Sequence, residues 1–451
     1  MKIIIIGVGT IGRTILKTLT EEGHAITIID EDSERVETLV NLYDVSGVVG
    51  NGACMDIQLE AGMEGADLVM AMTGSDELNV FACLVAKKIG VKNTIARVRN
   101  PEYSHQIMDM KDELGISMIV NPEKDTAMEI YNQINLPSIA NIESFAKGKV
   151  LLVGIVAEGS CRMIGETLIS LGKKLKTKVL VCAVQRGNFV IIPTGNFLIE
   201  EGDRIYFTAN ANKLRDFLSE INLIPYPLKN IMIVGGNKVG FYLAEELSHK
   251  KYHVKVIEAN KENANEFAEL LPRVTVVHGN GTQHSLLLEQ GLEAMDAFVA
   301  LTNTDEENMV ISMFANKLKV QKTITQIRGD DLHGMLRELG IQNTVSPKEI
   351  VANRIISYVR ALANKRGSNI LTLSRIVEGT VEALEFSAKK SSKIYDIPLK
   401  DLPIKKNCLI ACIIRDHEIM IPNGLSCIQQ GDNVIVVTTH KNFDDLEDVL
   451  E

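Results

Sequence analysis

A glycine-rich segment close to the N-terminus carries the residues best suited to bind a nucleotide. In Gly7-Val8-Gly9-Thr10-Ile11-Gly12 the first glycine allows a tight turn, the second lets a pyrophosphate reach the backbone, and the third lets a helix pack on a strand. A helix that starts within this segment would offer N–H groups and the positive end of its dipole to phosphates. The segment therefore predicts a dinucleotide site.

An acidic residue follows at the distance that ribose recognition requires. Asp30 ends the next apolar run of the sequence. A carboxylate at this position accepts hydrogen bonds from both hydroxyls of a ribose diol and repels a 2′-phosphate. The pattern favours NAD(H) over NADP(H), and an adenine nucleotide with a free diol fits as well.

The same pattern returns in the second half of the chain. Four segments recur in one order and at nearly constant spacing, namely 3–12 and 231–240, Asp30 and Glu258, 50–52 and 279–281, and 73–79 and 302–308. Such a repeat indicates two tandem copies of one nucleotide-binding design.

The second copy departs from the first in its glycine loop. Asn237 stands where the second glycine is expected, so its side chain must point away or donate to a phosphate if a ligand is to approach. Lys238 and Glu258 favour a retained site. A degenerate copy that binds nothing is the alternative. Arg13 of the first copy has an uncharged counterpart, Phe241.

Short apolar runs alternate with helix-like segments in each copy. In the first copy we expect strands at 3–6, 25–29, 45–49, 68–71, 94–98 and 116–120, and helices at 10–22, 76–89 and 103–114. Runs that are apolar on both faces, with helices between them, are typical of a parallel sheet covered on both sides. The expected fold class is α/β, with two doubly wound, parallel-sheet Rossmann-like domains.

A small α+β region follows each copy. After the first copy we expect strands at 151–156, 179–185, 189–192 and 204–208, and helices at 164–171 and 213–221. Gly202-Asp203 recurs as Gly431-Asp432 and suits a turn before the last strand. The expected domains are 1–138, 139–224, 228–366 and 367–451.

Composition excludes several classes of protein. The 451 residues are 45% hydrophobic and 24% charged, as in a globular chain with several cores, and the formal net charge of −10 disfavours nucleic acid as a partner. No run approaches the roughly 18 apolar residues of a membrane span, so we expect a cytoplasmic protein. The seven cysteines form no C-x-x-C pair, and we expect buried thiols without a metal.

Other polar residues allow two interpretations. Asp76-Glu77 and Asp305-Glu306 could be acid–base pairs, but acids at a helix start more often cap N–H groups and complement the dipole. Arg97 and Arg99 alternate along a strand, so only one can face a cleft. His278 and His284 lack further ligands at metal spacing.

Two helices could reach beyond their own domain. The segment 351–363 has apolar residues at helical spacing, and the corresponding segment 127–134 is shorter and weaker. Each could pack on its own domain or bridge the two nucleotide domains. The sequence leaves both arrangements open.

Taken together, these segments resemble the regulator of potassium conductance domain family, and the doubled arrangement is similar to the cytosolic regulatory subunits of Trk potassium uptake systems. The resemblance rests on Gly7-x-Gly9-x-x-Gly12, Asp30, 50–52, Thr73-x-x-Asp76-Glu77-x-Asn79 and 97–101. It implies that the loop and the acid hold NAD(H), or else ATP or ADP, and that strand-end arginines approach phosphates. It also implies a ring-forming tetramer at the inner face of the cell membrane, bound to a potassium-transporting subunit of the Trk type.

The expected nucleotide-binding residues come from both copies. They are Gly7, Val8, Gly9, Thr10, Ile11, Gly12, Asp30, Asn51, Gly52, Thr73, Arg97, Gly235, Gly236, Asn237, Lys238, Val239, Gly240, Glu258, Asn280, Gly281 and Thr302.

An enzyme would need more than these residues. A dehydrogenase requires a proton-transferring side chain beside the nicotinamide and a substrate cavity, and the small domains carry no such constellation. We therefore expect no catalytic residues, no metal and a regulatory role. An NAD-dependent oxidoreductase with an unrecognised substrate site is the alternative.

Overall fold

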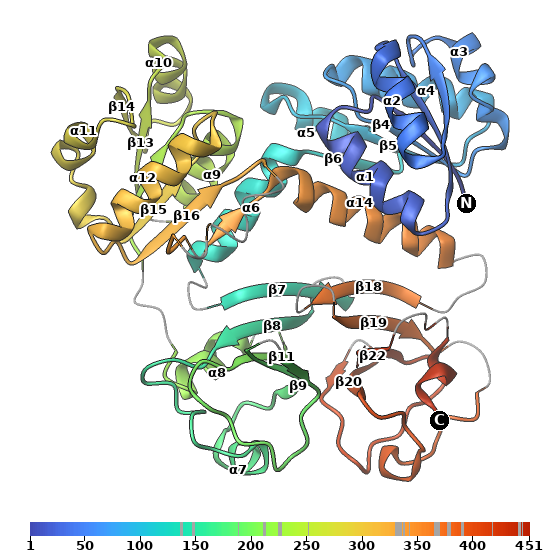
Figure 1. The fold of residues 1–451 in the computed structure, drawn as a ribbon, viewed down its shortest axis with the longest axis vertical. Coiled ribbons are helices and arrows are strands. Elements are labelled where there is room, and N and C mark those ends of the chain that lie inside the picture. The colour runs from blue at the N-terminus through green and yellow to red at the C-terminus, as the bar shows by residue number, and fades with distance from the viewer. Residues whose placement is uncertain are drawn as a thin grey trace. The chain divides into compact units, whose positions relative to one another are not determined.

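The computed structural model consists of two compact units (Figure 1). One unit comprises Met1–Asn135 and Pro227–Ile356, and the other comprises Leu136–Tyr226 and Ser357–Glu451. The structure describes residues 1–135, 139–146, 149–187, 189–210, 213–223, 228–250, 252–329, 336, 339–341, 343–364, 370–376, 380–388, 392–416, 418–440, 443 and 445–451.

The first unit begins with a six-stranded parallel sheet in the order β3-β2-β1-β4-β5-β6. Its strands are β1 (Lys2–Ile6), β2 (Ala25–Asp30), β3 (Ser46–Val49), β4 (Leu68–Ala71), β5 (Asn93–Arg97) and β6 (Met118–Val120). The helices are α1 (Thr10–Glu21), α2 (Ser33–Tyr43), α3 (Met55–Glu60), α4 (Asp76–Ile89) and α5 (Pro101–Asp109). The strand order reverses between β1 and β4, which opens a crevice at the carboxyl ends of these strands.

The second sheet of this unit repeats the same order as β14-β13-β12-β15-β16-β17. Its strands are β12 (Asn230–Val234), β13 (His253–Glu258), β14 (Thr275–His278), β15 (Ala297–Ala300), β16 (Lys322–Gln326) and β17 (Thr344–Val345). The helices are α9 (Lys238–His249), α10 (Lys261–Leu270), α11 (His284–Glu289) and α12 (Asp305–Lys317). The doubly wound fold class is confirmed in both copies.

Helix α6 (Pro122–Asn135) leaves the first copy and packs on the second. Its buried residues Ala127, Ile130 and Ile134 belong to one core with Leu243 and Leu247 of α9. Helix α14 (Pro347–Asn364) meets α6 through an ion pair between Arg354 and Asp125, with 2.5 Å between nitrogen and oxygen. Of the two arrangements that the sequence leaves open, α6 therefore adopts the bridging one.

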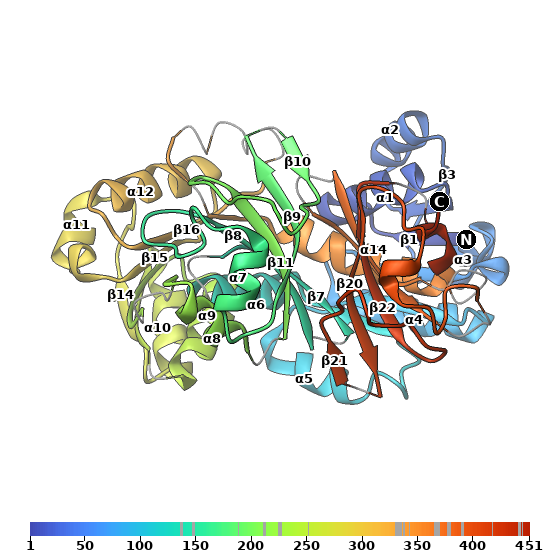
Figure 2. The same cartoon turned by 90° about the horizontal axis from the view of Figure 1, so that it is seen from below.

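The second unit contains two five-stranded antiparallel sheets, in the orders β10-β9-β11-β8-β7 and β18-β19-β22-β20-β21. The first has β7 (Ile139–Phe145), β8 (Val150–Val156), β9 (Leu180–Arg186), β10 (Phe189–Ile191) and β11 (Arg204–Asn210), with helices α7 (Leu168–Lys174) and α8 (Leu214–Glu220). The second has β18 (Ile370–Ile376), β19 (Val381–Ser387), β20 (Cys408–Arg415), β21 (Glu418–Met420) and β22 (Asn433–Thr438). Phe145, Leu152 and Tyr206 share one core with Ala411 and Val437, so the two sheets pack together (Figure 2).

Several observed elements differ from the expected ones. Helix α7 starts at Leu168 and not at 164, because the Thr167 side chain caps the Ser170 N–H. Helix α5 ends at Asp109, five residues early. Strand β7 was not foreseen. The expected domain boundaries near 138, 224–228 and 366 fall at or next to residues outside the described ranges.

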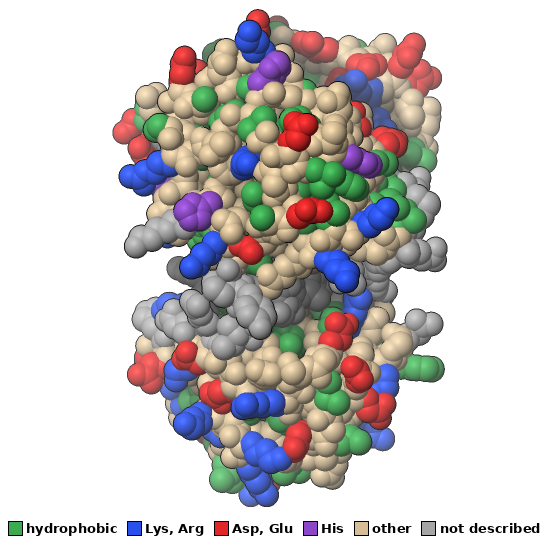
Figure 3. All heavy atoms as spheres, turned by 90° about the vertical axis from the view of Figure 1, so that its left-hand side faces the viewer, with side chains coloured by type: hydrophobic (Ala, Val, Ile, Leu, Met, Phe, Trp, Pro, Cys, Tyr) green, Lys and Arg blue, Asp and Glu red, His purple; other side chains and the backbone are tan. Residues whose placement is uncertain are grey.

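Five of the seven cysteines are buried, as expected, whereas Cys54 is exposed and Cys427 is partly exposed. Burial raises the pKa of Cys182 and of Cys412 to about 12, so both stay protonated thiols at neutral pH. Among the described helices, none combines the length and the apolar character of a membrane span. Acidic and basic side chains are mixed on the face drawn in Figure 3.

Candidate functional site

The first glycine loop is tightly packed at Gly7 and Gly12 and open at Gly9. Gly7 has φ +85°, and a Cβ atom there would lie 2.8 Å from the Thr73 nitrogen. A Cβ on Gly12 would lie 2.4 Å from the Gly7 carbonyl oxygen. Apart from its neighbours along the chain, nothing lies within 4 Å of a Cβ built on Gly9. The loop therefore needs glycine at two positions for its fold, and at Gly9 its backbone is accessible to a ligand.

The start of α1 is suited to bind an anion. Gly9 is the N-cap residue, and no side chain caps the helix. Thr10 and Ile11 follow directly. Because the first N–H groups of a helix lack intrahelical partners, this end offers donors and a partial positive charge to a phosphate. The residues present thus fit a dinucleotide pyrophosphate.

Asp30 lies at the end of β2, beside this loop. Its carboxylate accepts hydrogen bonds from Val8 N at 2.9 Å and Asp32 N at 3.1 Å. It also accepts from Arg35 Nη1, which lies 3.1 Å and 3.2 Å from its two oxygens. Arg35 was not recognised in the sequence. Its place in the first turn of α2, five residues after the acid, was the only signal.

Glu258 occupies the matching place in the second copy. It accepts hydrogen bonds from Gly236 N at 2.5 Å and from Asn260 N at 2.8 Å. The residue that matches Arg35 is Asn263, at the same position of helix α10. The two acids therefore share their backbone donors but differ in their charged neighbours.

In the second glycine loop, the Asn237 side chain bonds to the start of helix α9. Asn237 Oδ1 accepts from Gly240 N at 3.1 Å, and Asn237 Nδ2 donates to the Leu301 carbonyl at 2.5 Å. Asn237 thus caps α9. Gly235 and Gly240 keep the tight geometry, because a Cβ on Gly240 would lie 2.3 Å from the Gly235 carbonyl oxygen.

The Gly-Asn-Gly segments bring the backbone close to the central strands. A Cβ on Gly52 would lie 2.1 Å from Ile6 Cγ2, and one on Gly281 would lie 2.2 Å from Val234 Cγ1. Asn51 and Asn280 each accept a hydrogen bond from a backbone N–H two residues later, at 2.8 Å and 2.9 Å. Each segment therefore packs against the last residue of a central strand, Ile6 of β1 or Val234 of β12.

Buried asparagines hold the strand ends in place. Asn79 Oδ1 accepts from the backbone N–H and the hydroxyl of Thr73, both at 2.8 Å, and Asn79 Nδ2 donates to the Arg97 carbonyl at 3.0 Å. Asn308 makes matching bonds to Thr302 N and to the Gln326 carbonyl. The motif in the sequence is therefore explained by a clamp between two strand ends, a role that its polar composition did not reveal.

Asp76 is at the start of α4, as expected, but its carboxylate does not cap that helix. Ser75 caps it, and Asp76 instead accepts from Arg99 N at 2.7 Å and Asn100 N at 2.8 Å. Asp305 likewise accepts from the N–H groups of Arg328 and Gly329. These carboxylates hold backbone turns, which disfavours the acid–base interpretation.

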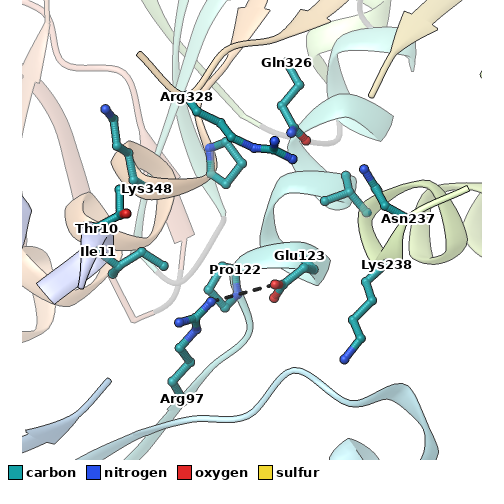
Figure 4. Close-up of a pocket in the computed structure, with 12 residues that line it drawn as sticks. Thr10, Ile11, Arg97, Pro122, Glu123, Asn237, Lys238, Gln326, Arg328 and Lys348 are labelled. Atoms are coloured by element: carbon teal, nitrogen blue, oxygen red, sulfur yellow. Dashed lines mark ion pairs between the residues drawn. The ribbon is translucent and has the colours of Figure 1, made fainter. Parts of the chain in front are cut away.

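A cavity of about 440 Å³ lies between the two copies, within the first unit (Figure 4). It is lined by Thr10, Ile11, Arg97, Pro122, Glu123, Asn237, Lys238, Val239, Gln326, Arg328, Pro347 and Lys348. Most of these residues are matched positions of the repeat, and four helices begin at the cavity wall. Both glycine loops therefore border one shared space.

The cavity carries an excess of positive charge. Arg97, Lys238, Arg328 and Lys348 line it, against a single carboxylate, Glu123. Arg97 Nη2 lies 3.8 Å from Glu123 Oε1, and burial lowers the pKa of Arg97. In the first copy Arg97 lines this cavity and Arg99 does not, whereas in the second copy both matching residues, Gln326 and Arg328, line it.

No metal centre is visible in the described part of the chain. It contains no group of three or more His, Cys, Asp or Glu side chains placed to hold a metal ion. The His284 ring instead stacks on Phe314, with 3.9 Å between the ring centres.

Comparison with known proteins places these features in a family. The TrkA-N domain family matches residues 3–122 and 231–347, and the TrkA-C domain family matches residues 152–222. The Trk system potassium uptake protein TrkA of Vibrio alginolyticus is 30% identical and covers 98% of this chain and 97% of its own length. TrkA homolog 1 of Methanosarcina mazei is 33% identical and covers 97% of each chain.

The fold is also found among solved structures. The structure described as the GsuK channel bound to NAD covers 98% of this chain and 77% of its own, with a TM-score of 0.64 and 16% sequence identity. At this identity the similarity shows the fold alone.

Proposed function

This chain belongs to the TrkA family of Trk system potassium uptake proteins, and from this premise we propose that it is the cytosolic regulatory subunit of a potassium transporter. In this proposal nucleotides bind in the crevices of the first unit and change the conformation that the protein presents to its membrane partner. The protein binds the nucleotide without transforming it.

The observation that carries the proposal is the first loop together with its acid. The open backbone at Gly9, the uncapped start of α1 and the Asp30 carboxylate are the three groups that an adenosine dinucleotide needs. NAD(H) is the ligand that this set favours, and ATP or ADP is the second candidate. The GsuK structure is described as bound to NAD, which agrees with this choice.

The residues act in different ways. Val8, Gly9, Thr10 and Ile11 offer backbone N–H groups to the pyrophosphate, and Asp30 accepts from the ribose. Asn51, Gly52 and Thr73 line the crevice, and Arg97 faces the phosphates from the shared cavity. A bound nicotinamide would carry a hydride, but we assign no residue of this chain to its transfer.

The second crevice is the weaker site in this proposal. Asn237 occupies the start of α9, so a phosphate must displace its carbonyl oxygen from Gly240 N before it can bind there. Glu258 and Lys238 are in place for an adenine nucleotide. The two crevices should therefore differ in affinity.

In this proposal, nucleotide binding at the shared cavity changes the position of the two copies relative to each other. Both loops border it, and α6 ties the first copy to α9, the helix that the second loop begins. A ligand that binds one arrangement of the copies more tightly shifts their equilibrium, and a change from 1:99 to 99:1 needs about 5.5 kcal/mol of differential affinity. Several sites in one assembly can share that free energy.

The assembly is part of the same proposal. As in the regulators that the chain resembles, we infer a ring-forming tetramer, held at the inner face of the membrane by a transporter subunit of the Trk type. The four-domain division at 138, 224–228 and 366 stays a prediction.

Calorimetry on the purified full-length protein tests the proposal. We expect NAD⁺, NADH, ATP or ADP to bind, and Asp30→Ala to weaken binding at the first site by at least about tenfold, since a charged acceptor is lost. Glu258→Ala should act on the second site. Glu37→Ala, which removes an exposed acid of α2, is the control. Absence of binding by all four nucleotides would contradict the proposal, and turnover of NADH with a metabolite pool would favour an oxidoreductase.

A further inference from the structure

Arg35 occupies acceptor positions of Asp30, the carboxylate proposed to bind the ribose at the first site. A carboxylate offers roughly four lone-pair directions. At Asp30 the four are taken by Val8 N, Asp32 N and the two contacts of Arg35 Nη1. A ribose diol can bond to Asp30 only if it displaces the guanidinium group. The first crevice therefore releases a cation when adenosine binds.

The released cation stays at the edge of the site. Arg35 Nη2 is 3.0 Å from an oxygen of Asp32, and the Arg35 side chain is 35% exposed, so it can turn without disturbing the core. Arg35 Nη1 now lies about 3 Å from the Asp30 oxygens, so a ribose oxygen that bonds this carboxylate would lie within about 6 Å of the position that Nη1 leaves. A phosphate on the 2′-oxygen would extend into this gap.

The second crevice has no such cation. Glu258 accepts two backbone N–H groups and, among the described residues, forms no ion pair. Two acceptor directions are therefore open to a plain diol from the start. A 2′-phosphate would meet an unpaired carboxylate there and be repelled.

From this difference we propose that Arg35 is a specificity-determining residue of the first nucleotide site, and that it lets this site accept a 2′-phosphorylated dinucleotide, NADP(H), far better than the second site does. The inference rests on the proposed function, because it assumes that the crevice binds an adenosine dinucleotide. It departs from the expectation that Asp30 alone decides against a 2′-phosphate. An Arg that binds phosphate with charge-assisted hydrogen bonds offsets the repulsion by the acid.

The repeat supplies the matched variant. Asn263 holds the position of Arg35 in the second copy, and both backbone N–H groups bond the N-cap side chain at 3.0 Å. Arg35→Asn therefore gives the first site the side chain of the second without changing the helix start. Arg35→Lys keeps the charge but loses the fork geometry. Arg13→Asn removes an exposed charge from α1 and is the control.

The experiment is calorimetry with NAD⁺ and NADP⁺ on the full-length protein carrying Glu258→Ala, so that the heat reports the first site. The measured quantity is the ratio of the NADP⁺ to the NAD⁺ dissociation constant. We expect Arg35→Asn to raise this ratio by at least about tenfold, Arg35→Lys to raise it less, and Arg13→Asn to leave it within about threefold, because only Arg35 reaches the 2′-position.

Two results would overturn the inference. One is a parent protein that binds NAD⁺ but shows no NADP⁺ binding, and the other is an equal loss of both affinities in Arg35→Asn, which would make Arg35 a support for Asp30 only. Both results leave the proposed function intact, because NAD⁺ still binds to the parent protein. Failure of NAD⁺ itself to bind would instead count against the proposed function, and the inference would fall with it.

Discussion

The hydroxyl of Tyr242 on α9 donates a hydrogen bond to the carbonyl oxygen of Arg99, with 3.1 Å between the two oxygens. The same hydroxyl accepts from Asn121 Nδ2 at 3.1 Å. One side chain of the second copy thus holds the turn after β5 and the end of β6 in the first. Since α9 begins at the second glycine loop, this contact joins the second loop to the strand end that carries Arg97.

Removal of this hydroxyl should destabilise the protein. Asn121 is buried, so Tyr242→Phe removes the acceptor of its amide nitrogen and the side-chain donor to the Arg99 carbonyl, at a cost of about 1–3 kcal/mol. Urea unfolding measures the difference. Tyr43→Phe, whose hydroxyl makes no hydrogen bond among the described residues, should stay within about 0.5 kcal/mol of the parent. Equal effects of the two variants would show that the Tyr242 contact contributes nothing.

Substitutions at Gly12 and Gly9 of the first loop should distinguish an effect on folding from an effect on nucleotide binding. A Cβ on Gly12 meets the Gly7 carbonyl oxygen, so Gly12→Ala must move the backbone and should lower the melting temperature by several degrees. Gly9→Ala has space for its methyl group and should fold normally. That methyl group lies where the pyrophosphate is expected, so NAD⁺ affinity should fall by at least about tenfold. Normal affinity in Gly9→Ala would contradict the assigned position of the phosphates.

The bridging helix can be tested through its buried face. Ile130 of α6 is fully buried in the core of the second copy, so Ile130→Ala should cost about 2–5 kcal/mol. Met128 lies on the same helix and is 36% exposed, and Met128→Ala should cost less than about 1 kcal/mol. Hydrogen exchange should show faster opening of α9 in Ile130→Ala. Opening confined to the first copy would argue against the bridge.

Lys322 should make stability depend on pH. Burial lowers its pKa to about 8 from the ordinary 10.5. Between these values the unfolded chain binds more protons than the folded chain, so the free energy of unfolding rises with pH in this window. The penalty for burying the charged amine is therefore absent above pH 10.5, grows as the pH falls, and is complete below 8.

The matching variant removes the titrating amine. In the parent protein the free energy of unfolding should rise by about 2–3 kcal/mol between pH 7.5 and 10.5, as measured by urea unfolding at each pH. Lys322→Met should abolish this rise. Lys317→Met, at an exposed position of α12, should keep the rise. The account of Lys322 is wrong if the parent and Lys322→Met show parallel pH profiles.

The sequence predicted the features that depend on local patterning. Short apolar runs such as 3–6, followed directly by glycine, favour central strands, and the spacing of the glycines indicates the close approaches at Gly7 and Gly12. The acids at Asp30 and Glu258 lie where the repeat placed them, at the ends of β2 and β13. These features need no knowledge of distant contacts.

What the sequence could not predict depends on partners that lie far apart or compete locally. An amphipathic helix such as α6 shows an apolar face but not which core that face covers. Arg35 has five acids within five residues along the chain, and only the folded turn shows that it pairs with Asp30 and Asp32. Asn79 appears as one more polar residue of a helix until the strand ends beside it are known. In the small domains, the paired bonds of Arg186 to Asp203 were hidden for the same reason.

Potassium flux through a reconstituted transporter tests the central claim most directly. Proteoliposomes that hold the Trk-type membrane subunit would be measured with this protein and with NAD⁺, NADH, ATP or ADP in turn. We expect at least one nucleotide to change the flux severalfold, and the doubly substituted Asp30→Ala, Glu258→Ala protein to abolish this response while it still binds the membrane subunit. The account would be contradicted if the potassium flux were the same with and without each nucleotide while this protein was bound to the membrane subunit.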